Sequence, residues 1–157
     1  MDKKIKTLGR LLKALSNQRP RKKVVFTNGC FDILHYGHIK YLKSARSRGD
    51  ILVVGLNSDA SVKKLKGDKR PINTQKERAE ILAALESVDH VVIFSQDTPY
   101  KLIKSLKPDV LVKGGDWKKE KIVGADIVLA NGGKCLSLPY VKDRSTTNTI
   151  KKLIHAC

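Results

Sequence analysis

The chain has 157 residues, of which 41% are hydrophobic and 30% are charged, so its composition excludes an intrinsically disordered protein and fits one folded domain over residues 1–157. Lys and Arg outnumber Asp and Glu by 32 to 15, and the net charge of +17 favours polyanionic partners: nucleic acid, an anionic membrane surface or small phosphates. No run of basic residues exceeds three, however, so we expect most lysines to solvate helix faces.

The N-terminal segment predicts a helix and not a membrane anchor. Nowhere does the sequence hold the roughly 20 apolar residues that span a bilayer, and the N-terminus lacks the apolar core of a signal peptide. Residues 1–20 instead predict an amphipathic helix with its lead-in, because apolar residues recur at helical spacing: Ile5, Leu8, Leu11, Leu12 and Leu15. We expect this helix to dock against its own domain, although the surface of a membrane is open to it. The three cysteines lie far apart, which is typical of neither a disulfide framework nor a zinc knuckle and favours the cytoplasm.

The rest of the chain alternates strands and helices. In chain order we expect a strand at 23–27, a helix at 38–48, a strand at 50–56, a loop over 57–74, a helix at 75–87, a strand at 90–94, a helix at 98–106, a strand at 109–113, a helix at 120–131, a strand at 134–138 and a helix at 145–155. The strands are continuously apolar, so both faces of the sheet are covered. This pattern predicts a doubly wound, Rossmann-like α/β fold with five parallel strands and helices on both faces.

The turn after the first strand is the first candidate site, since ligands of such sheets bind beyond the carboxyl ends of the strands. The strand ends at about Thr27 and runs through TNGCFDILHYGH into a helix. This turn matches neither the dinucleotide fingerprint G-x-G-x-x-G nor the P-loop. A strand that feeds through glycine into a helix N-terminus is still an anion cradle, because free N–H groups and the helix dipole favour phosphate.

Two histidines in this turn, His35 and His38, fall on one helical face. Gly37 between them lets a phosphate approach the backbone, and both rings would then donate N–H groups to its oxygens. A transition-metal site would need a third ligand, and only Asp32 lies nearby. Local capping by the rings is the other alternative. A pair of histidines on one face, beside a glycine and after a strand, favours phosphate binding.

Residues 35–38 form an H-x-G-H motif, preceded by Gly-Cys-Phe-Asp at 29–32 and followed near the C-terminus by Arg-Ser-Thr-Thr at 144–147. This combination resembles the nucleotidyltransferase superfamily that includes the cytidylyltransferases, over the chain from about residue 22 to its end. The resemblance implies a Rossmann-like fold, transfer of a nucleotidyl group and a homodimer.

Longer segments, among them FTNGCFDILHYGH, LNSDASVKKLKG and DVLVKGGDW, resemble the adenylyltransferases of bacterial heptose biosynthesis. The resemblance implies that ATP and a heptose 1-phosphate give an ADP-heptose and pyrophosphate, for lipopolysaccharide or a related surface glycan. The glycerol-phosphate cytidylyltransferases have Arg-Thr-x-Gly before their second signature, whereas this chain has Asp143 in place of the glycine. This departure leaves open whether Lys142 or Arg144 contacts the triphosphate.

The resemblance also implies roles for individual residues. His35 and His38 would be catalytic, together with one lysine of the set Lys63, Lys64 and Lys66, for which we take Lys64. The nucleotide would contact Thr27, Asn28, Gly29, Cys30, Phe31, Gly37, Lys113, Gly115, Asp116, Arg144, Ser145, Thr146 and Thr147. The sugar phosphate would contact Asp32, Asn57, Asp59, Arg70 and Arg78.

Simpler structural roles are open for several of these residues. Ser145 and Thr146 are favoured as N-caps of the last helix in any case. The resemblance implies that the loop from Lys113 to Trp117 lies near the base and ribose, but Trp117 would serve equally as a surface anchor. Arg78 would equally pair with Glu77 or Glu80. Asp32 would either help to hold a metal ion or cap its own turn.

The implied chemistry needs no dedicated base. The second pKa of a phosphate monoester is about 6, so the attacking group is largely a dianion at neutral pH. Positioning and positive charge would carry the reaction. Mg²⁺ is expected to arrive with ATP, held mainly by phosphate oxygens, without dedicated protein ligands.

Two rival functions remain at this point. One keeps the fold and transfers a cytidylyl group to glycerol-phosphate or ethanolamine-phosphate. The other is a basic nucleic-acid-binding protein, but aromatic residues make up only 5% of the chain and no basic-aromatic stretch offers stacking for bases. We therefore expect neither a specific nucleic-acid partner nor a membrane.

Overall fold

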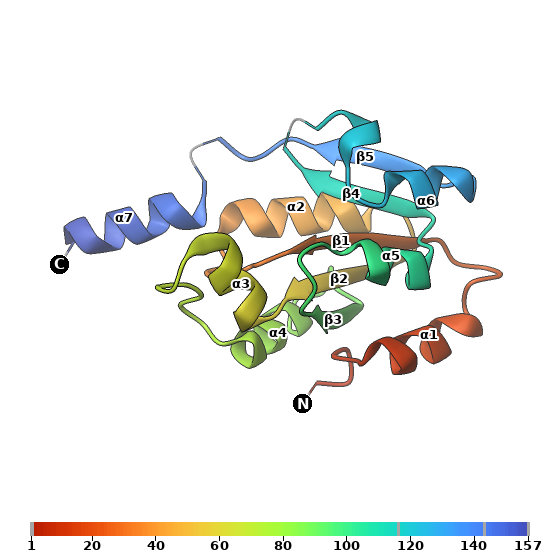
Figure 1. Ribbon diagram of the computed structural model, residues 1–157, viewed down its shortest axis with the longest axis horizontal. Coiled ribbons are helices and arrows are strands. Elements are labelled where there is room, and N and C mark those ends of the chain that lie inside the picture. The colour runs from red at the N-terminus through yellow and green to blue at the C-terminus, as the bar shows by residue number, and fades with distance from the viewer. Residues whose placement is uncertain (1, 116, 143, 157) are drawn as a thin grey trace.

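A five-stranded, fully parallel sheet forms the centre of the protein (Figure 1). The computed structural model describes residues 2–115, 117–142 and 144–156. The strand order is β3-β2-β1-β4-β5, and the strands are β1 (Val24–Gly29), β2 (Ile51–Asn57), β3 (His90–Phe94), β4 (Val110–Gly114) and β5 (Lys134–Leu138). The doubly wound α/β fold predicted from the sequence is confirmed.

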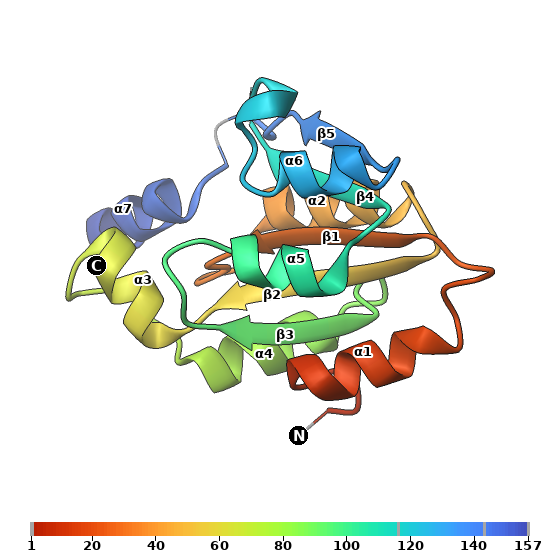
Figure 2. The same ribbon diagram turned by 45° about the vertical axis from the view of Figure 1, so that its right-hand side comes forward.

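Helices cover both faces of this sheet (Figure 2). They are α1 (Leu8–Ser16), α2 (Tyr36–Arg46), α3 (Asp59–Lys66), α4 (Gln75–Ala83), α5 (Tyr100–Leu106), α6 (Ala125–Ala130) and α7 (Thr146–Ala156). One core joins α1, α5 and α6 to the sheet, and a second core joins α2 and α4 to its other face. Helix α7 buries none of its residues and stands out beside the carboxyl ends of the strands (Figure 1).

The predicted loop over 57–74 was wrong in its first half, where the structure has helix α3. Ser58 caps this helix, since its side chain accepts a hydrogen bond from the Ser61 N–H. The helix was hard to predict because it has only two turns, and Val62 is its one buried aliphatic side chain.

Four other predicted boundaries also need correction. The helix expected over 75–87 already ends at Ala83. The N-terminal helix begins at Leu8, and Ile5 lies before it in an isolated parallel bridge with Val91 at the edge of the sheet. The helix expected over 120–131 begins only at Ala125, since Gly124 before it has a positive φ of 87°. Helix α2 begins at Tyr36, two residues earlier than the periodicity predicted.

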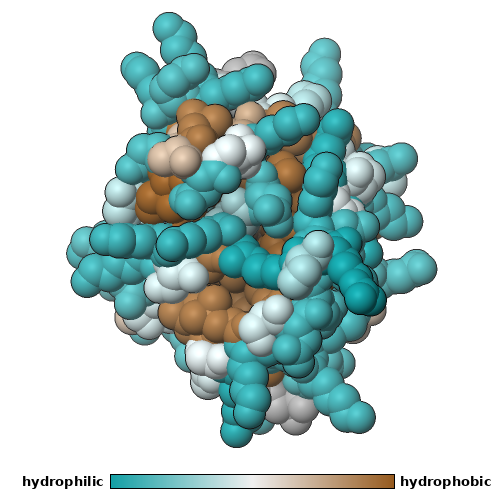
Figure 3. All heavy atoms as spheres, turned by 90° about the vertical axis from the view of Figure 1, so that its right-hand side faces the viewer, coloured by the Kyte–Doolittle hydropathy of each residue, from teal (hydrophilic) through white to brown (hydrophobic). Residues whose placement is uncertain are grey.

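The strand bounds follow from the apolar runs and hold to within two residues. None of the described helices is long and apolar enough to cross a bilayer. At the end of the molecule remote from α7, hydrophilic side chains project around a few apolar areas (Figure 3). That distribution fits the expectation that much of the polar and basic surface is simply solvated.

Candidate functional site

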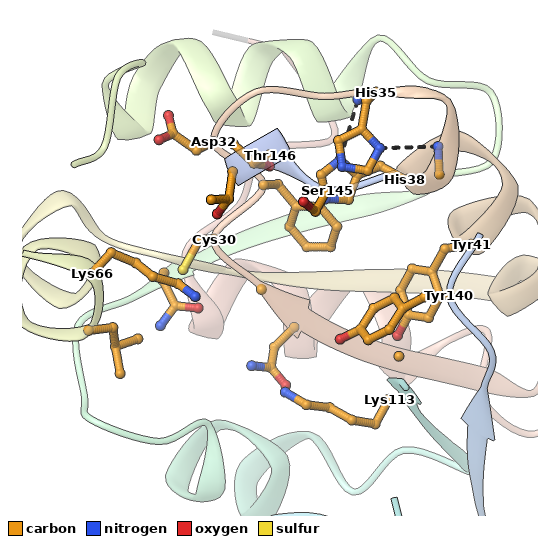
Figure 4. Close-up of a pocket in the computed structure, with 18 of the residues that line it drawn as sticks. Cys30, Asp32, His35, His38, Tyr41, Lys66, Lys113, Tyr140, Ser145 and Thr146 are labelled. Atoms are coloured by element: carbon orange, nitrogen blue, oxygen red, sulfur yellow. Dashed lines mark hydrogen bonds between the residues drawn. The ribbon is translucent and has the colours of Figure 1, made fainter. Parts of the chain in front are cut away.

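A cleft of about 820 Å³ lies over the carboxyl ends of the strands. Its walls come from the turn between β1 and α2, the end of α3, the end of β4 and the start of α7. Figure 4 shows His35, His38, Ser145 and Thr146 close together on one side of this cleft. The two sequence signatures, more than a hundred residues apart in the chain, therefore meet at one site.

The turn between β1 and α2 is held in a tight conformation. Phe31 adopts a positive φ of 45°, and its ring lies 5.4 Å from the ring of His38 between centroids. A Cβ at Gly29 would meet the Phe31 ring at 3.0 Å, so glycine lets the ring fold back over the strand end. Phe31 thus packs beside His38 in this turn.

The buried carboxylate of Asp32 fixes the next part of this turn. It accepts hydrogen bonds from Arg70 Nε at 2.5 Å, the Ile72 N–H at 2.8 Å and the Asn73 N–H at 2.9 Å. Burial by itself would raise the pKa of Asp32, but the bonds from Asn73, Ile72 and Arg70 hold this pKa below its ordinary value. Asp32 therefore positions Arg70 and its loop, and its oxygens are engaged within the protein.

Each histidine uses one ring nitrogen to cap helix α2. Nδ1 of His35 accepts from the Gly37 N–H at 3.1 Å, and Nδ1 of His38 accepts from the His35 N–H at 3.4 Å. The two rings are stacked with centroids 3.9 Å apart. Because an accepting nitrogen carries no hydrogen in a neutral ring, the proton of each ring lies on Nε2, which is then a hydrogen-bond donor.

Both histidines are neutral at pH 7. Burial and, to a smaller extent, the neighbouring His35 lower the pKa of His38 to about 4. Burial and the charge of Arg144 lower the pKa of His35. The local capping role and the phosphate-binding role therefore coexist: Nδ1 organises the helix start while Nε2–H is left for an anion.

We expect the free protein to lose stability as the pH falls from about 6.5 towards 4. Between about pH 6.5 and pH 4, His38 takes up a proton in the unfolded chain, where its pKa is the ordinary 6.5. It does not do so in the folded protein, where its pKa is about 4. At about pH 5 this difference removes at most about 2 kcal/mol from the free energy of unfolding. Urea unfolding at about pH 7.5 and pH 5 measures it, and the variant His38→Asn, which does not titrate, should show a smaller difference. Equal losses in both proteins would contradict this assignment.

The start of α7 closes over the histidines. Ser145 Oγ accepts from the Asn148 N–H at 3.1 Å and so caps the helix, and Thr146 Oγ1 donates to the Ile33 carbonyl at 3.4 Å. A Cβ at Gly37 would meet Nδ1 of His35 at 3.0 Å and Cβ of Arg144 at 3.2 Å. A methyl group there would press on both the His35 ring and Arg144, which favours glycine at this position.

Two tyrosines that sequence reasoning missed form an aromatic wall of the cleft. Tyr41 and Tyr140 both line it, and a Cβ at Gly114 would meet Tyr140 at 2.8 Å and Tyr41 at 3.4 Å. Burial raises the pKa of Tyr41 to about 12. The signal for Tyr41 was present, since it follows His38 by one helical turn. Tyr140 follows β5, and nothing in its sequence surroundings marks it.

Thr27 is buried behind Tyr41 and contacts its hydroxyl. It is fully buried, and its hydroxyl lies 2.6 Å from the Tyr41 hydroxyl, which in turn donates to the Val112 carbonyl at 3.4 Å. The predicted direct contact between Thr27 and the nucleotide is therefore replaced by a contact with Tyr41. Gly115, with a φ of 100°, likewise packs against Tyr140 and does not line the cleft.

The loop after β4 is anchored by Trp117. This side chain is 48% exposed and outside the cleft, and its Nε1 donates to the Gly114 carbonyl at 3.1 Å. Its exposure fits the alternative that it is a surface anchor. The predicted contact from Asp116 lies outside the described residues, as does Asp143.

Of the three lysines in α3, Lys66 and not Lys64 lines the cleft. The ammonium of Lys64 lies 2.6 Å from Asp97 Oδ1, and both side chains are largely exposed. The position of Lys64 therefore does not favour the prediction, which was made without knowing that these lysines lie on a helix or which of them faces the cleft. Lys63 also lies outside the cleft.

Arg78 is buried and does not face the cleft. Its guanidinium donates to three backbone carbonyls, at 3.0, 2.6 and 2.9 Å, which belong to Asn73, Cys30 and Asn57. It also pairs with Asp59 at 2.8 Å. Arg78 and Asp59 therefore form a structural ion pair with each other, in place of the predicted contacts with the sugar phosphate. The acidic partner of Arg78 is Asp59 and neither Glu77 nor Glu80.

The remaining predicted residues meet at the cleft. They are Asn28, Gly29, Cys30, Phe31, Asp32, Gly37, Asn57, Arg70, Lys113, Arg144 and Thr147. Among the described residues no three His, Cys, Asp or Glu side chains gather in a way that would hold a metal ion.

Most of the chain resembles known proteins. Residues 26–131 match the cytidylyltransferase-like family. The chain is 56% identical over 156 residues to the bifunctional protein HldE of Geobacter metallireducens, an alignment that covers 99% of this chain and 32% of that protein. It is 61% identical over 132 residues to the protein of the same name from Aliarcobacter butzleri, covering 84% of this chain and 27% of that one. The chain therefore spans about a third of the length of these curated relatives.

Two solved structures resemble the fold. The lipopolysaccharide core biosynthesis protein of Thermoplasma volcanium superposes with a TM-score of 0.63 at 28% identity, covering 77% of this chain and 98% of that one. Pantoate-beta-alanine ligase of Francisella tularensis superposes with a TM-score of 0.62 at 17% identity, covering 96% of this chain and 78% of that one. The second likeness concerns the fold alone.

Proposed function

Because the chain belongs to the cytidylyltransferase-like family, we propose that its cleft transfers AMP from ATP to a heptose 1-phosphate, giving an ADP-heptose and pyrophosphate. The segments that resemble the adenylyltransferases of heptose biosynthesis support this choice of substrates, as does the identity to the HldE proteins over nearly the whole chain. The solved structure from Thermoplasma volcanium, named for lipopolysaccharide core biosynthesis, supports a surface glycan as the destination.

One observation carries the proposal: the stacked pair His35 and His38 faces the same cleft as Ser145 at the start of α7 (Figure 4). Neutral imidazoles that donate from Nε2, hydroxyls and the free N–H groups of a helix start all suit a polyphosphate. Arg144 adds a full positive charge beside them. Together they provide donors for the oxygens of a nucleoside triphosphate.

The reaction follows from these donors. A phosphate oxygen of the sugar 1-phosphate attacks the α-phosphorus of ATP, the bond from that phosphorus to the bridging oxygen breaks, and pyrophosphate leaves with the negative charge. The attacking group is already a dianion, so no base is required. The protein supplies positioning and donors aimed at the charge that develops on the leaving group.

Each wall of the cleft has a part in this reaction. His35 and His38 bind oxygens of the α- and β-phosphates, and Ser145 and Thr146 bind the β- and γ-phosphates. The N–H groups near Cys30 and Phe31 complete the cradle. The base and ribose lie against Tyr140. Mg²⁺ enters as part of the Mg–ATP substrate. A homodimer and a cytoplasmic location, both expected from the sequence, remain parts of the proposal.

Pyrophosphate release with each of the four nucleoside triphosphates, against a panel of sugar 1-phosphates and alcohol phosphates, tests this function. We expect turnover with ATP and D-glycero-β-D-manno-heptose 1-phosphate to exceed all other pairs by about a hundredfold or more, since a site built for one base rejects another through unpaired polar groups. Preference for CTP with glycerol-phosphate or ethanolamine-phosphate would contradict it. Turnover with no pair, alongside DNA binding that falls steeply with salt, would favour the nucleic-acid alternative.

A further inference from the structure

A row of polar side chains crosses the floor of the cleft on the face of the sheet that carries α5 and α6. Phe26 of β1 and Leu111 of β4 are paired in the sheet and belong to the core beneath those helices. Two residues further along each strand, Asn28 and Lys113 project from the same face, because side chains alternate along a strand. Both line the cleft.

Asn57 at the end of β2 extends this row. Val53 of β2 lies in the same core as Phe26, its partner in the sheet, and Asn57 follows it by an even number of residues. Its amide Nδ2 donates to Ser61 Oγ at 2.9 Å, which fixes the side chain. The polar floor, defined as Asn57, Asn28 and Lys113, therefore spans three neighbouring strands in the order β2-β1-β4.

The histidines enter the cleft from the other face of the sheet. Helix α2, which carries His38 in its first turn, packs through Leu42 and Ala45 into the core of the α4 face. Figure 4 accordingly shows Lys113 across the cleft from His35 and His38, with Lys66 at a third side. The cleft thus has an imidazole side and a lysine side.

The lysine side of the cleft carries positive charge of its own. Burial lowers the pKa of Lys113. An ionised Cys30 opposes this effect, and the charge of Lys66 adds to it, so the two ammonium groups lie close enough to repel. The charges of Lys66, Arg78 and Arg70 also act together on the Cys30 thiol, although burial dominates and raises its pKa. A dianion placed between Lys66 and Lys113 would relieve their repulsion.

The geometry of in-line displacement indicates which phosphate group would lie between Lys66 and Lys113. The attacking oxygen and the leaving oxygen lie on opposite sides of the α-phosphorus. Under the proposed function, the imidazoles, Ser145 and Arg144 hold the leaving pyrophosphate on one side. The attacking phosphate must then come from the opposite side, which is the side of the polar floor.

We propose that Lys113 binds the phosphate of the attacking sugar 1-phosphate and that the amide of Asn28 beside it binds a hydroxyl of the same sugar. This inference rests on the proposed function and assigns its second substrate to the α5 side of the cleft. Lys113 then serves the acceptor and not the nucleotide, in contrast to the expectation from the sequence. Asn57 borders the same subsite.

The variant Lys113→Met tests the assignment, since methionine keeps much of the length of the side chain and removes its charge. The matched control is Lys134→Met, because Lys134 is an exposed residue at the opposite end of the neighbouring strand β5. We expect Lys113→Met to raise the KM for heptose 1-phosphate by about 30-fold, as the loss of a charged hydrogen bond does. The dissociation constant of α,β-methylene-ATP should change by less than about threefold, and Lys113→Arg should recover most of the loss.

Direct binding separates failure of the subsite from failure of the proposed function. Calorimetry with α,β-methylene-ATP already bound needs no turnover, and in it Lys113→Met should weaken heptose 1-phosphate by a similar factor. Weaker binding of the ATP analogue with unchanged binding of the sugar phosphate would assign Lys113 to the nucleotide and overturn the proposal. Unchanged binding of both ligands would also overturn it. Binding of the sugar phosphate through Lys113, together with wild-type protein that releases no pyrophosphate, would support the subsite and contradict the proposed reaction.

Discussion

Replacing His38 by asparagine is expected to lower kcat by about 100- to 1000-fold, the usual effect of removing one preorganised donor to a developing negative charge. The Oδ1 atom of asparagine reaches the position of Nδ1, so the hydrogen bond from the His35 N–H and the cap of α2 are kept. What is lost is the Nε2–H group, the donor that the proposed reaction assigns to a phosphate oxygen. Single-turnover rates with saturating ATP and sugar phosphate measure the effect on the chemical step.

A matched variant distinguishes donation from packing. In His38→Gln the amide nitrogen reaches the position of Nε2, so a donor is kept where the phosphate binds while the capping interaction is lost. We expect this variant to keep at least about a tenth of the wild-type kcat and to be less stable than His38→Asn. If His38→Asn turned over at the wild-type rate, the Nε2–H group would have no part in the reaction.

Replacing Arg78 by methionine is expected to lower the free energy of unfolding by about 3–5 kcal/mol, because three buried carbonyl groups lose their donor. The guanidinium joins the carbonyls of Asn73, Cys30 and Asn57, which belong to three segments that frame the cleft. Loss of these hydrogen bonds should loosen the turn after β1, the carboxyl end of β2 and the loop before α4. Urea unfolding at neutral pH measures the effect.

Arg46→Met is the control for this change. Arg46 pairs with Asp89 at 2.8 Å, but both side chains are about a third exposed. A pair of this kind contributes at most about 1 kcal/mol. Equal destabilisation by the two substitutions would contradict the organising role of Arg78.

The strands were predictable because each is a short, continuous apolar run that only a sheet covered on both faces can bury. The H-x-G-H motif was informative for a similar reason, since two histidines around a glycine at a strand end have few purely structural uses. Helix α3 was missed because a two-turn helix with one buried valine leaves almost no periodic signal. That error carried over to its lysines, and Lys64 was chosen where the structure places Lys66 in the cleft.

The burial of Arg78 could not be foreseen either. Arginine is mostly exposed in proteins, and only the meeting of three distant carbonyl groups makes this position suitable for it. The role of Tyr140 depends in the same way on tertiary contacts, since its ring packs on Gly114 from another strand's end. Sequence patterns report local periodicity, whereas these residues are defined by what the fold brings to them.

A crystal structure with Mg²⁺ and α,β-methylene-ATP tests most directly whether the imidazole pair and the start of α7 hold a nucleoside triphosphate. We predict that Nε2 of His35 or His38 lies within hydrogen-bond distance of an α- or β-phosphate oxygen, and that Ser145 or Thr146 contacts the β- or γ-phosphate. A triphosphate bound away from both signatures, with the two Nε2 atoms facing only solvent, would contradict this arrangement and the reaction built on it.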